Sequence, residues 1–164
     1  MTVYRYCTPE WLQFSLESYR ATPRFQQELA KLTMKIFFKI KAEPSWGIEE
    51  ELIFGSFLDQ GALEQLAFFS EEVAIREADY ILAATPQEWK RLLRKESKFV
   101  TDFMLGKVTL EQGSKVGVLA VAPHSTTLVD SLTQAELQFP DEMTAEELEE
   151  FRAYVGEFRQ ELGV

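Results

Sequence analysis

Three Thr-Pro pairs divide this chain of 164 residues and limit what it can fold into. In each pair the threonine hydroxyl is suited to capping the start of a helix. Proline is tolerated directly after the cap, because its missing N–H would have no partner inside the helix. The pairs are Thr8-Pro9, Thr22-Pro23 and Thr85-Pro86. These starts, followed by apolar residues at helical spacing, predict helices over residues 9–20, 23–32 and 86–96.

One segment between these helices has the period of a half-buried strand. Residues 33–41 alternate four apolar side chains with a face that carries three lysines and a phenylalanine. Because successive side chains of a strand point to opposite faces, one face should lie on the core and the other should be basic. A hairpin at Gln60-Gly61 and four further strands are expected. The four strand segments are 49–59, 62–69, 78–85 and 107–112.

Two segments admit more than one interpretation. Residues 62–69 are assigned to a strand, but the first six of them also fit a helix. Residues 115–132 favour a helix kinked at Pro123, and a strand followed by a helix is the alternative. Before them, a short helix over residues 99–105 should end at Gly106, which can adopt a positive φ.

The net charge of −10 is concentrated at the C-terminal end of the chain. Residues 134–164 hold nine acids and two bases, which leaves the first 133 residues nearly balanced. Thr144 and Glu147 form a capping box at the start of an acidic helix there. Its predicted apolar seam comprises Leu148, Phe151, Val155 and Phe158. We therefore predict a domain over residues 1–133, which includes the helices of 9–32, and an acidic C-terminal helix within 134–164 that packs on it or caps it.

Composition excludes several classes of function. The overall acidity argues against a general nucleic-acid binder, because neutralising phosphates needs clustered Lys and Arg. A single Cys and a single His rule out a disulfide framework and argue against a metal site on count alone. No glycine-rich phosphate-binding motif occurs. A Ser–His–Asp set can be written with His124, Ser125 and Asp130, so a small hydrolase is a minor hypothesis. We expect no catalysis, no metal and no cofactor.

One basic cluster interrupts the acidic surface, and no targeting signal accompanies it. Five cations lie between residues 90 and 98. They form a solvent face, pair with the acidic tail, or contact either anionic lipid headgroups at a membrane surface or a ligand carboxylate. The N-terminus lacks a secretory pattern and no run approaches the ~18 apolar residues of a membrane span. We expect a cytoplasmic protein.

The apolar content is the most informative part of the composition. Thirteen Phe, three Trp and four Met exceed what a minimal core of this size requires. Together with the lack of catalytic polar groups, this predicts a hydrophobic ligand cavity. The residues expected to line it are Phe99, Phe103, Met104, Val118, Leu119, Val121 and Ala122.

The order of these segments resembles the sterol carrier protein (non-specific lipid-transfer, SCP2-like) domain, in particular its bacterial members. A strand over 78–85 runs into a helix with Trp89 and Leu92, and a motif of phenylalanine, Gly-Lys, alternating strand and glycine follows. Residues 119–123 resemble the apolar final helix of bacterial members. The resemblance extends over residues 25–132. The residues that match the motif are Phe103, Gly106, Lys107, Val108, Leu110 and Gly113.

This resemblance implies an α+β fold with a five-stranded, mostly antiparallel sheet covered by helices on one face. The N-terminal and C-terminal helices are additions to the common domain. It also implies an apolar tunnel between sheet and helices for a fatty acid or a sterol-like lipid, without catalysis.

Two main hypotheses follow. The first is binding or transfer of a hydrophobic ligand, with the acidic C-terminal helix as a lid or side wall and a transient contact with a membrane surface. The second is a structural or interaction protein with a filled core, in which the seam of that helix joins a homodimer or another partner.

Overall fold

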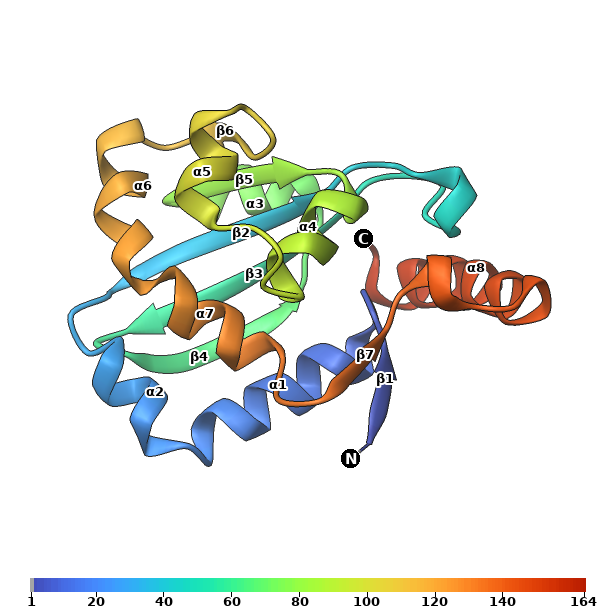
Figure 1. Cartoon of the computed structure of the whole chain (residues 1–164), viewed down its shortest axis with the longest axis horizontal. Coiled ribbons are helices and arrows are strands. Elements are labelled where there is room, and N and C mark those ends of the chain that lie inside the picture. Colours follow the sequence, from blue (N-terminus) through green and yellow to red (C-terminus); the bar gives the residue numbers. More distant parts are fainter. Residues whose placement is uncertain (1) are drawn as a thin grey trace.

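The computed structural model describes residues 2–164, and a five-stranded sheet forms its centre (Figure 1). The strand order is β4-β3-β2-β5-β6, with β2 and β5 parallel and every other pair antiparallel. This confirms the predicted α+β fold with a mostly antiparallel sheet. The strands are β2 (Met34–Ile40), β3 (Leu52–Asp59), β4 (Ala62–Phe68), β5 (Tyr80–Ala84) and β6 (Thr109–Gln112).

Most of the helices lie over one face of this sheet, and α3 lies on the other (Figure 1). On the first face α1 packs on β4, while α7 contacts both α1 and α4. The helices of this layer are α1 (Pro9–Arg20), α2 (Pro23–Glu28), α4 (Pro86–Leu93), α5 (Phe99–Met104), α6 (Lys115–Val121) and α7 (Ser125–Leu132). On the second face α3 (Glu71–Glu77) contacts β3. Helix α3 was not among the predicted helices, although the Ser70 hydroxyl caps it by accepting a hydrogen bond from the Val73 amide.

The Thr-Pro pairs start helices as predicted, but by two different means. The Thr8 and Thr85 side chains accept hydrogen bonds from backbone amides three residues later. The Thr22 hydroxyl instead donates to the Ser18 carbonyl, 2.8 Å away, and makes no cap bond. Two of the helices are shorter than expected, since α2 ends at Glu28 and α4 at Leu93. The chain reverses after α4 through Lys95, whose φ is +60°.

Both ambiguous segments are resolved. Residues 62–68 form the strand β4, paired antiparallel with β3. Residues 115–132 form a broken helix, in which the 3₁₀ turn η2 (Ala122–His124) at Pro123 separates α6 from α7. Gly106 follows α5 with a φ of +78°, as its place after a helix predicts.

The two ends of the chain meet in a second, small sheet. Strand β1 (Val3–Arg5) pairs in parallel with β7 (Glu136–Gln138). Directly after β1, the Tyr6 amide donates to the Gln138 carbonyl at 2.9 Å. Two further 3₁₀ turns are η1 (Pro44–Trp46), which precedes β3, and η3 (Pro140–Glu142), which follows β7.

The C-terminal helix α8 (Ala145–Leu162) carries the predicted capping box and apolar seam. Of the seam, Phe151, Val155 and Phe158 are buried and Leu148 is half-buried. The Phe158 ring stacks on Phe68 of β4, with 5.1 Å between the ring centroids. The acidic helix therefore packs on the body through its own seam. Within residues 2–164 no helix combines the length and apolar character that crossing a bilayer requires.

Candidate functional site

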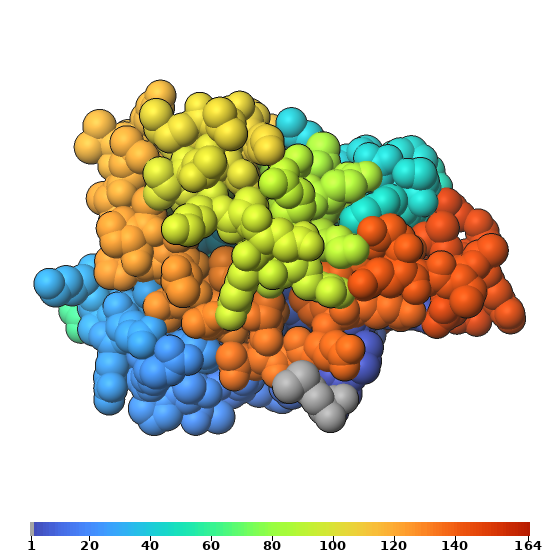
Figure 2. Space-filling view, viewed as in Figure 1, coloured from blue at the N-terminus to red at the C-terminus, as the bar shows by residue number. Residues whose placement is uncertain are grey.

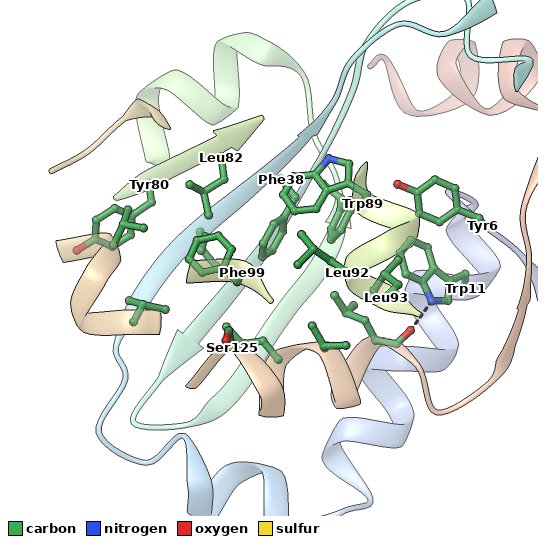
Figure 3. A pocket seen from close by; sticks show the side chains of 17 residues that line it. Tyr6, Trp11, Phe38, Tyr80, Leu82, Trp89, Leu92, Leu93, Phe99 and Ser125 are labelled. Carbon is green, nitrogen blue, oxygen red and sulfur yellow. Dashed lines mark hydrogen bonds between the residues drawn. The ribbon is translucent and has the colours of Figure 1, made fainter. Parts of the chain in front are cut away.

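An apolar cavity of about 70 Å³ lies between the sheet and the helices α4 to α7 (Figure 3). Inward-facing side chains of β2, β3 and β5 form its floor. The other walls come from the helices and from the segment after β1. The lining residues are Tyr6, Trp11, Ile36, Phe38, Phe54, Tyr80, Leu82, Trp89, Leu92, Leu93, Phe99, Val118, Val121, Ser125, Leu128, Val129 and Leu132.

Two tryptophans give the cavity aromatic walls without leaving polar atoms in it. The Trp89 Nε1–H donates to the Lys39 carbonyl at 2.9 Å, and its ring meets Phe38 edge-on. The Trp11 Nε1–H donates to the Leu132 carbonyl at 2.9 Å. Because a buried indole N–H needs a partner, these bonds fix both rings with their apolar surfaces toward the cavity.

The cavity lies beneath a hollow in the surface between α5 and the segment of η2 and α7 (Figure 2). Phe99 of α5 and Ser125 of α7 line the cavity on this side (Figure 3). Beside it, α5 and α6 expose large apolar side chains among three lysines that form no ion pair with any of residues 2–164. We call this surface the α5–α6 rim. It comprises Lys98, Val100, Met104, Leu105, Lys107, Lys115, Val116 and Leu119.

The structure brings together three of the seven residues predicted to line a cavity. Phe99, Val118 and Val121 line it. Val118 and Val121 share a face of α6 because they are three residues apart, whereas Leu119 lies about 100° further around the helix and is exposed. Met104, the last residue of α5, is 63% exposed. Phe103 and Ala122 are buried in the core but are not among the lining residues.

None of the four residues predicted to form a lid lines the cavity. Leu148, Phe151, Val155 and Phe158 belong to α8, which lies beyond the end of the sheet opposite α6 (Figure 1). The link from α8 to the cavity is indirect. Phe158 stacks on Phe68, and the Phe68 ring meets Phe54 of the cavity floor with 6.3 Å between centroids.

The floor and one end of the cavity are formed by residues that were not predicted to line it. Ile36 and Phe38 of the floor lie on the inward face that the alternation in residues 33–41 predicts. This alternation is therefore the sequence signal that could have identified them. Tyr6 and Trp11 come from the N-terminal segment, which reaches the cavity only because β1 pairs with β7. No local pattern in the sequence indicates that pairing.

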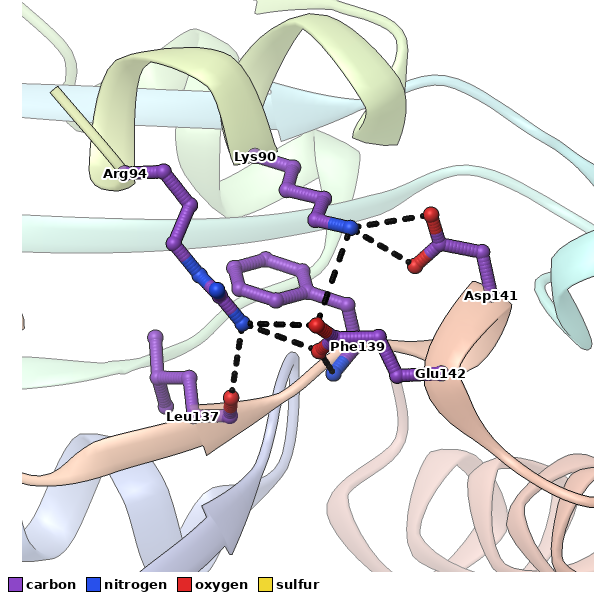
Figure 4. Close-up of polar contacts among 6 residues, drawn as sticks. All are labelled: Lys90, Arg94, Leu137, Phe139, Asp141 and Glu142. Carbon is purple, nitrogen blue, oxygen red and sulfur yellow. Dashed lines mark hydrogen bonds and ion pairs between the residues drawn. The ribbon is translucent and has the colours of Figure 1, made fainter. Parts of the chain in front are cut away.

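The basic cluster of residues 90–98 is largely neutralised within the chain (Figure 4). Lys90 pairs with Asp141 at 2.9 Å, and Arg94 pairs with Glu142 at 2.9 Å. Both cations also lie over the ring of Phe139, at 5.4 and 5.0 Å from its centroid. The cluster therefore holds the C-terminal segment against α4. Pairing with the acidic tail was one of the alternatives expected from the sequence.

The groups considered for catalysis are not assembled into a site. Asp130, the acid of the hypothetical triad with His124, pairs with Lys95 at 2.7 Å. Cys7 is fully buried, and burial raises the pKa of its thiol, which disfavours the reactive thiolate. No group of His, Cys, Asp and Glu side chains within residues 2–164 is arranged to hold a metal ion.

A second, more polar cleft of about 430 Å³ lies beside the C-terminus, and Glu50, Glu51 and Arg159 line it. Its charges pair with groups of the protein itself. Arg159 lies 3.5 Å from Glu50, and Lys39 lies 3.6 Å from Glu51. Burial raises the pKa of Glu51, and a hydrogen bond with Glu71 raises it further. Glu50, Glu51 and Arg159 are thus engaged with groups of the protein itself, so the apolar cavity is the stronger candidate.

No model of a protein family matches the chain, and no curated protein sequence matches it. Solved structures do. The solution structure of a conserved hypothetical protein from Thermus thermophilus, described as a candidate sterol carrier protein, has a TM-score of 0.69 at 17% identity. That alignment covers 80% of this chain and 90% of the other.

Two further structures have the same fold. A sterol carrier protein 2 aligns with a TM-score of 0.67 at 18% identity, over 78% of this chain and 97% of that one. The apo form of sterol carrier protein 2 from Yarrowia lipolytica aligns with a TM-score of 0.54 at 14% identity, over 76% and 89% of the two chains. The chain therefore has the fold of the sterol carrier protein domain, as its sequence resemblance predicts.

Proposed function

We propose that this protein binds or transfers a hydrophobic ligand, a fatty-acyl or sterol-like lipid, in the cavity between sheet and helices. One observation carries the proposal: all the lining side chains are apolar or aromatic except that of Ser125, and none is charged. Burying an apolar ligand there is favourable by ~25 cal/mol per Å² of apolar area. With no acid, base or activated nucleophile in the lining, the proposed role is non-catalytic.

A lipid of full length requires this cavity to widen. Its volume of about 70 Å³ is below the ~150 Å³ of an engineered apolar cavity that binds benzene. We expect the broken helix α6–η2–α7 to move when the cavity widens, because Pro123 interrupts it and its inner face is one wall of the cavity. Displacing this segment from the sheet would enlarge the cavity without breaking a strand.

Two valines of α6 provide a matched test. Val118 lines the cavity and is 2% exposed, whereas Val116 is 80% exposed. Val118→Phe should fill the cavity and weaken binding of a fluorescent long-chain fatty acid by about tenfold or more, the effect of ~1.4 kcal/mol. Val116→Phe adds the same ring outside the cavity and should leave the dissociation constant unchanged. Equal affinity in the wild type and in both variants would argue against ligand binding in this cavity.

The α5–α6 rim is the surface that we propose contacts a membrane during transfer. Exposed apolar side chains beside unpaired lysines favour an anionic bilayer, since each basic residue near such a surface contributes about 1 kcal/mol. Lys107→Glu combined with Lys115→Glu should abolish co-sedimentation with vesicles that contain phosphatidylserine. Vesicles of neutral phosphatidylcholine are the control. Undiminished co-sedimentation of the double variant would assign the contact to another surface.

For α8 we propose the role of a side wall that supports the floor of the cavity through Phe68. The same packing weakens the hypothesis of a dimer or partner interface at its seam, because Phe151, Val155 and Phe158 are buried in the chain's own core. Phe158→Ala should therefore lower the free energy of unfolding and leave the protein monomeric. Analytical ultracentrifugation of the wild type and the variant tests this role. A wild-type dimer that is lost in Phe158→Ala would instead support the interface hypothesis.

A further inference from the structure

The Tyr6 hydroxyl differs from the other buried polar groups around the cavity. Tyr6 is 1% exposed, and its ring is held between Trp11 and Phe139, with centroid distances of 5.4 and 4.8 Å. The N–H groups of both lining tryptophans donate to backbone carbonyls at 2.9 Å. Away from the cavity, the buried Tyr19 hydroxyl donates to the Gly61 carbonyl at 2.5 Å. No hydrogen bond within residues 2–164 involves the Tyr6 hydroxyl, and its oxygen is not among the fully enclosed polar atoms, which is consistent with an oxygen that faces the open space of the cavity.

The direction of the Tyr6 ring is fixed by the backbone and by its neighbours. Its amide donates to the Gln138 carbonyl of β7, which anchors the residue at the small sheet. From there the hydroxyl points toward Trp89 at one end of the cavity (Figure 3). Most buried hydroxyls in proteins are hydrogen-bonded, because an unpaired one loses its bonds with water without replacement. An unpaired hydroxyl aimed into an apolar cavity therefore indicates a group that bonds to a ligand.

The side chains around the Tyr6 hydroxyl favour a ligand whose polar group is uncharged. None of the lining side chains is charged, and the nearest cations on α4, Lys90 and Arg94, lie against the ring of Phe139 and pair with Asp141 and Glu142. An ionised carboxylate beside Tyr6 would be a buried charge without a counter-ion, which is strongly unfavourable. Burial also raises the pKa of Tyr6 well above its ordinary value, so the hydroxyl keeps its proton and can donate.

We propose that the Tyr6 hydroxyl donates a hydrogen bond to the one neutral polar group, a hydroxyl or carbonyl oxygen, of an otherwise apolar ligand. The ligand then enters with its polar group first, and its apolar part extends toward Phe99 and the hollow between α5 and α7. The preferred class is long-chain alcohols, sterol-like alcohols and neutral esters, in preference to ionised fatty acids. This inference rests on the proposed function and adds the ligand's polar group and its orientation.

Three probes of equal chain length test the proposal with the full-length protein: decane, 1-decanol and decanoate at pH 8. Their dissociation constants are measured by displacement of a bound fluorescent dye. Tyr6→Phe should weaken binding of 1-decanol by about tenfold, as loss of one hydrogen bond does, and leave binding of decane unchanged. In the wild type, decanoate should bind more weakly than 1-decanol.

The matched control is Tyr19→Phe, which also removes a buried tyrosine hydroxyl. Tyr19 is not among the residues that line the cavity, and its hydroxyl donates to the Gly61 carbonyl at 2.5 Å. This variant should keep the wild-type preference for 1-decanol over decane. If Tyr6→Phe binds 1-decanol as tightly as the wild type does, or if decanoate binds as tightly as 1-decanol, the inference is wrong while the proposed function stands. If none of the three probes binds, the proposed function fails and the inference fails with it.

Stability provides a second readout that separates a ligand-binding role from a structural one. Removing an unpaired buried hydroxyl should leave the melting temperature of the ligand-free protein unchanged or raise it. A clear fall in the melting temperature of Tyr6→Phe would show that the hydroxyl bonds within the protein, and it would overturn the inference.

Discussion

The two faces of the central sheet are built from the same strands but are packed differently. On the face toward α4 and α7, Ile36 and Phe38 of β2 border the cavity. On the face toward α3, Phe37 of the same strand is fully buried in a small apolar cluster, and the polar cleft beside the C-terminus borders this cluster only at Ile53 and Phe69. There Phe57 and Phe69 stack with an interplanar angle of 8°, and the Phe37 ring meets both of them.

This difference does not come from a shortage of apolar residues. The α3 face is filled because its parts fit closely: Gly55 of β3 leaves the space that the Phe37 ring occupies. The other face is spanned by several short helices, and their aromatic rings form walls around a space rather than filling it. The proposed binding site therefore lies on the face where packing is incomplete, and the other face is closely packed behind it.

The largest expected effect comes from comparing adjacent phenylalanines. Phe37→Ala, on the filled face, should lower the free energy of unfolding by about 3–5 kcal/mol, as deletion of a buried ring does. Phe38→Ala borders existing empty space and should cost roughly 1–2 kcal/mol less. Urea denaturation measures both. Equal losses would mean that the two faces are equally well packed, contrary to our comparison.

A single methyl group tests the close packing of the filled face. A Cβ at Gly55 would lie 2.8 Å from the Phe37 ring, so Gly55→Ala should cost about 1–3 kcal/mol through overpacking. The control is Gly156→Ala in α8, where a Cβ meets nothing within 4 Å. That change should instead stabilise the protein by roughly 0.5–1 kcal/mol through helix propensity. A Gly55→Ala variant as stable as the wild type would refute close packing on this face.

The smallest effect concerns the ion pair at the edge of the filled face. A hydrogen bond from Lys35, whose Nζ lies 2.9 Å from a Glu77 carboxylate oxygen, lowers the pKa of Glu77 from 4.5. A lowered carboxyl pKa contributes stability above pH 4.5, and this contribution is lost as the pH falls through the lower folded value. Glu77→Gln should therefore reduce stability slightly at pH 7 and make little difference at about pH 2. Urea denaturation at both pH values measures this, and an equal difference at both would exclude the ion pair as its source.

The sequence predicts elements whose signals are local. Thr85 identifies the start of α4, Gly106 the end of α5, and Pro123 the break between α6 and α7, because each acts on its own turn of the backbone. The alternation of residues 33–41 identifies the inward face of β2. The other face, expected to be basic and open to solvent, is instead packed against α3, and both Phe37 and Lys39 are buried. The order of these elements along the chain is also sufficient to indicate the sterol carrier protein fold.

The cavity itself could be predicted only in part. Val118 and Val121 follow from the periodicity of one helix, but Met104 and Leu119 show that an apolar residue in the correct segment can still point outward. Tyr6 could not be identified from the sequence, because the pairing that places it joins residues more than 130 positions apart. Such long-range pairs leave no local periodicity.

That pairing also sets the order in which the cavity can be completed during synthesis. Tyr6 leaves the ribosome well before β7, which anchors it, because β7 lies more than 130 residues further along the chain. Until β7 emerges, the sheet and the helices before it can assemble while the Tyr6 end of the cavity lacks its anchor. The nascent protein therefore acquires its rigid sheet first and the closed end of its cavity last.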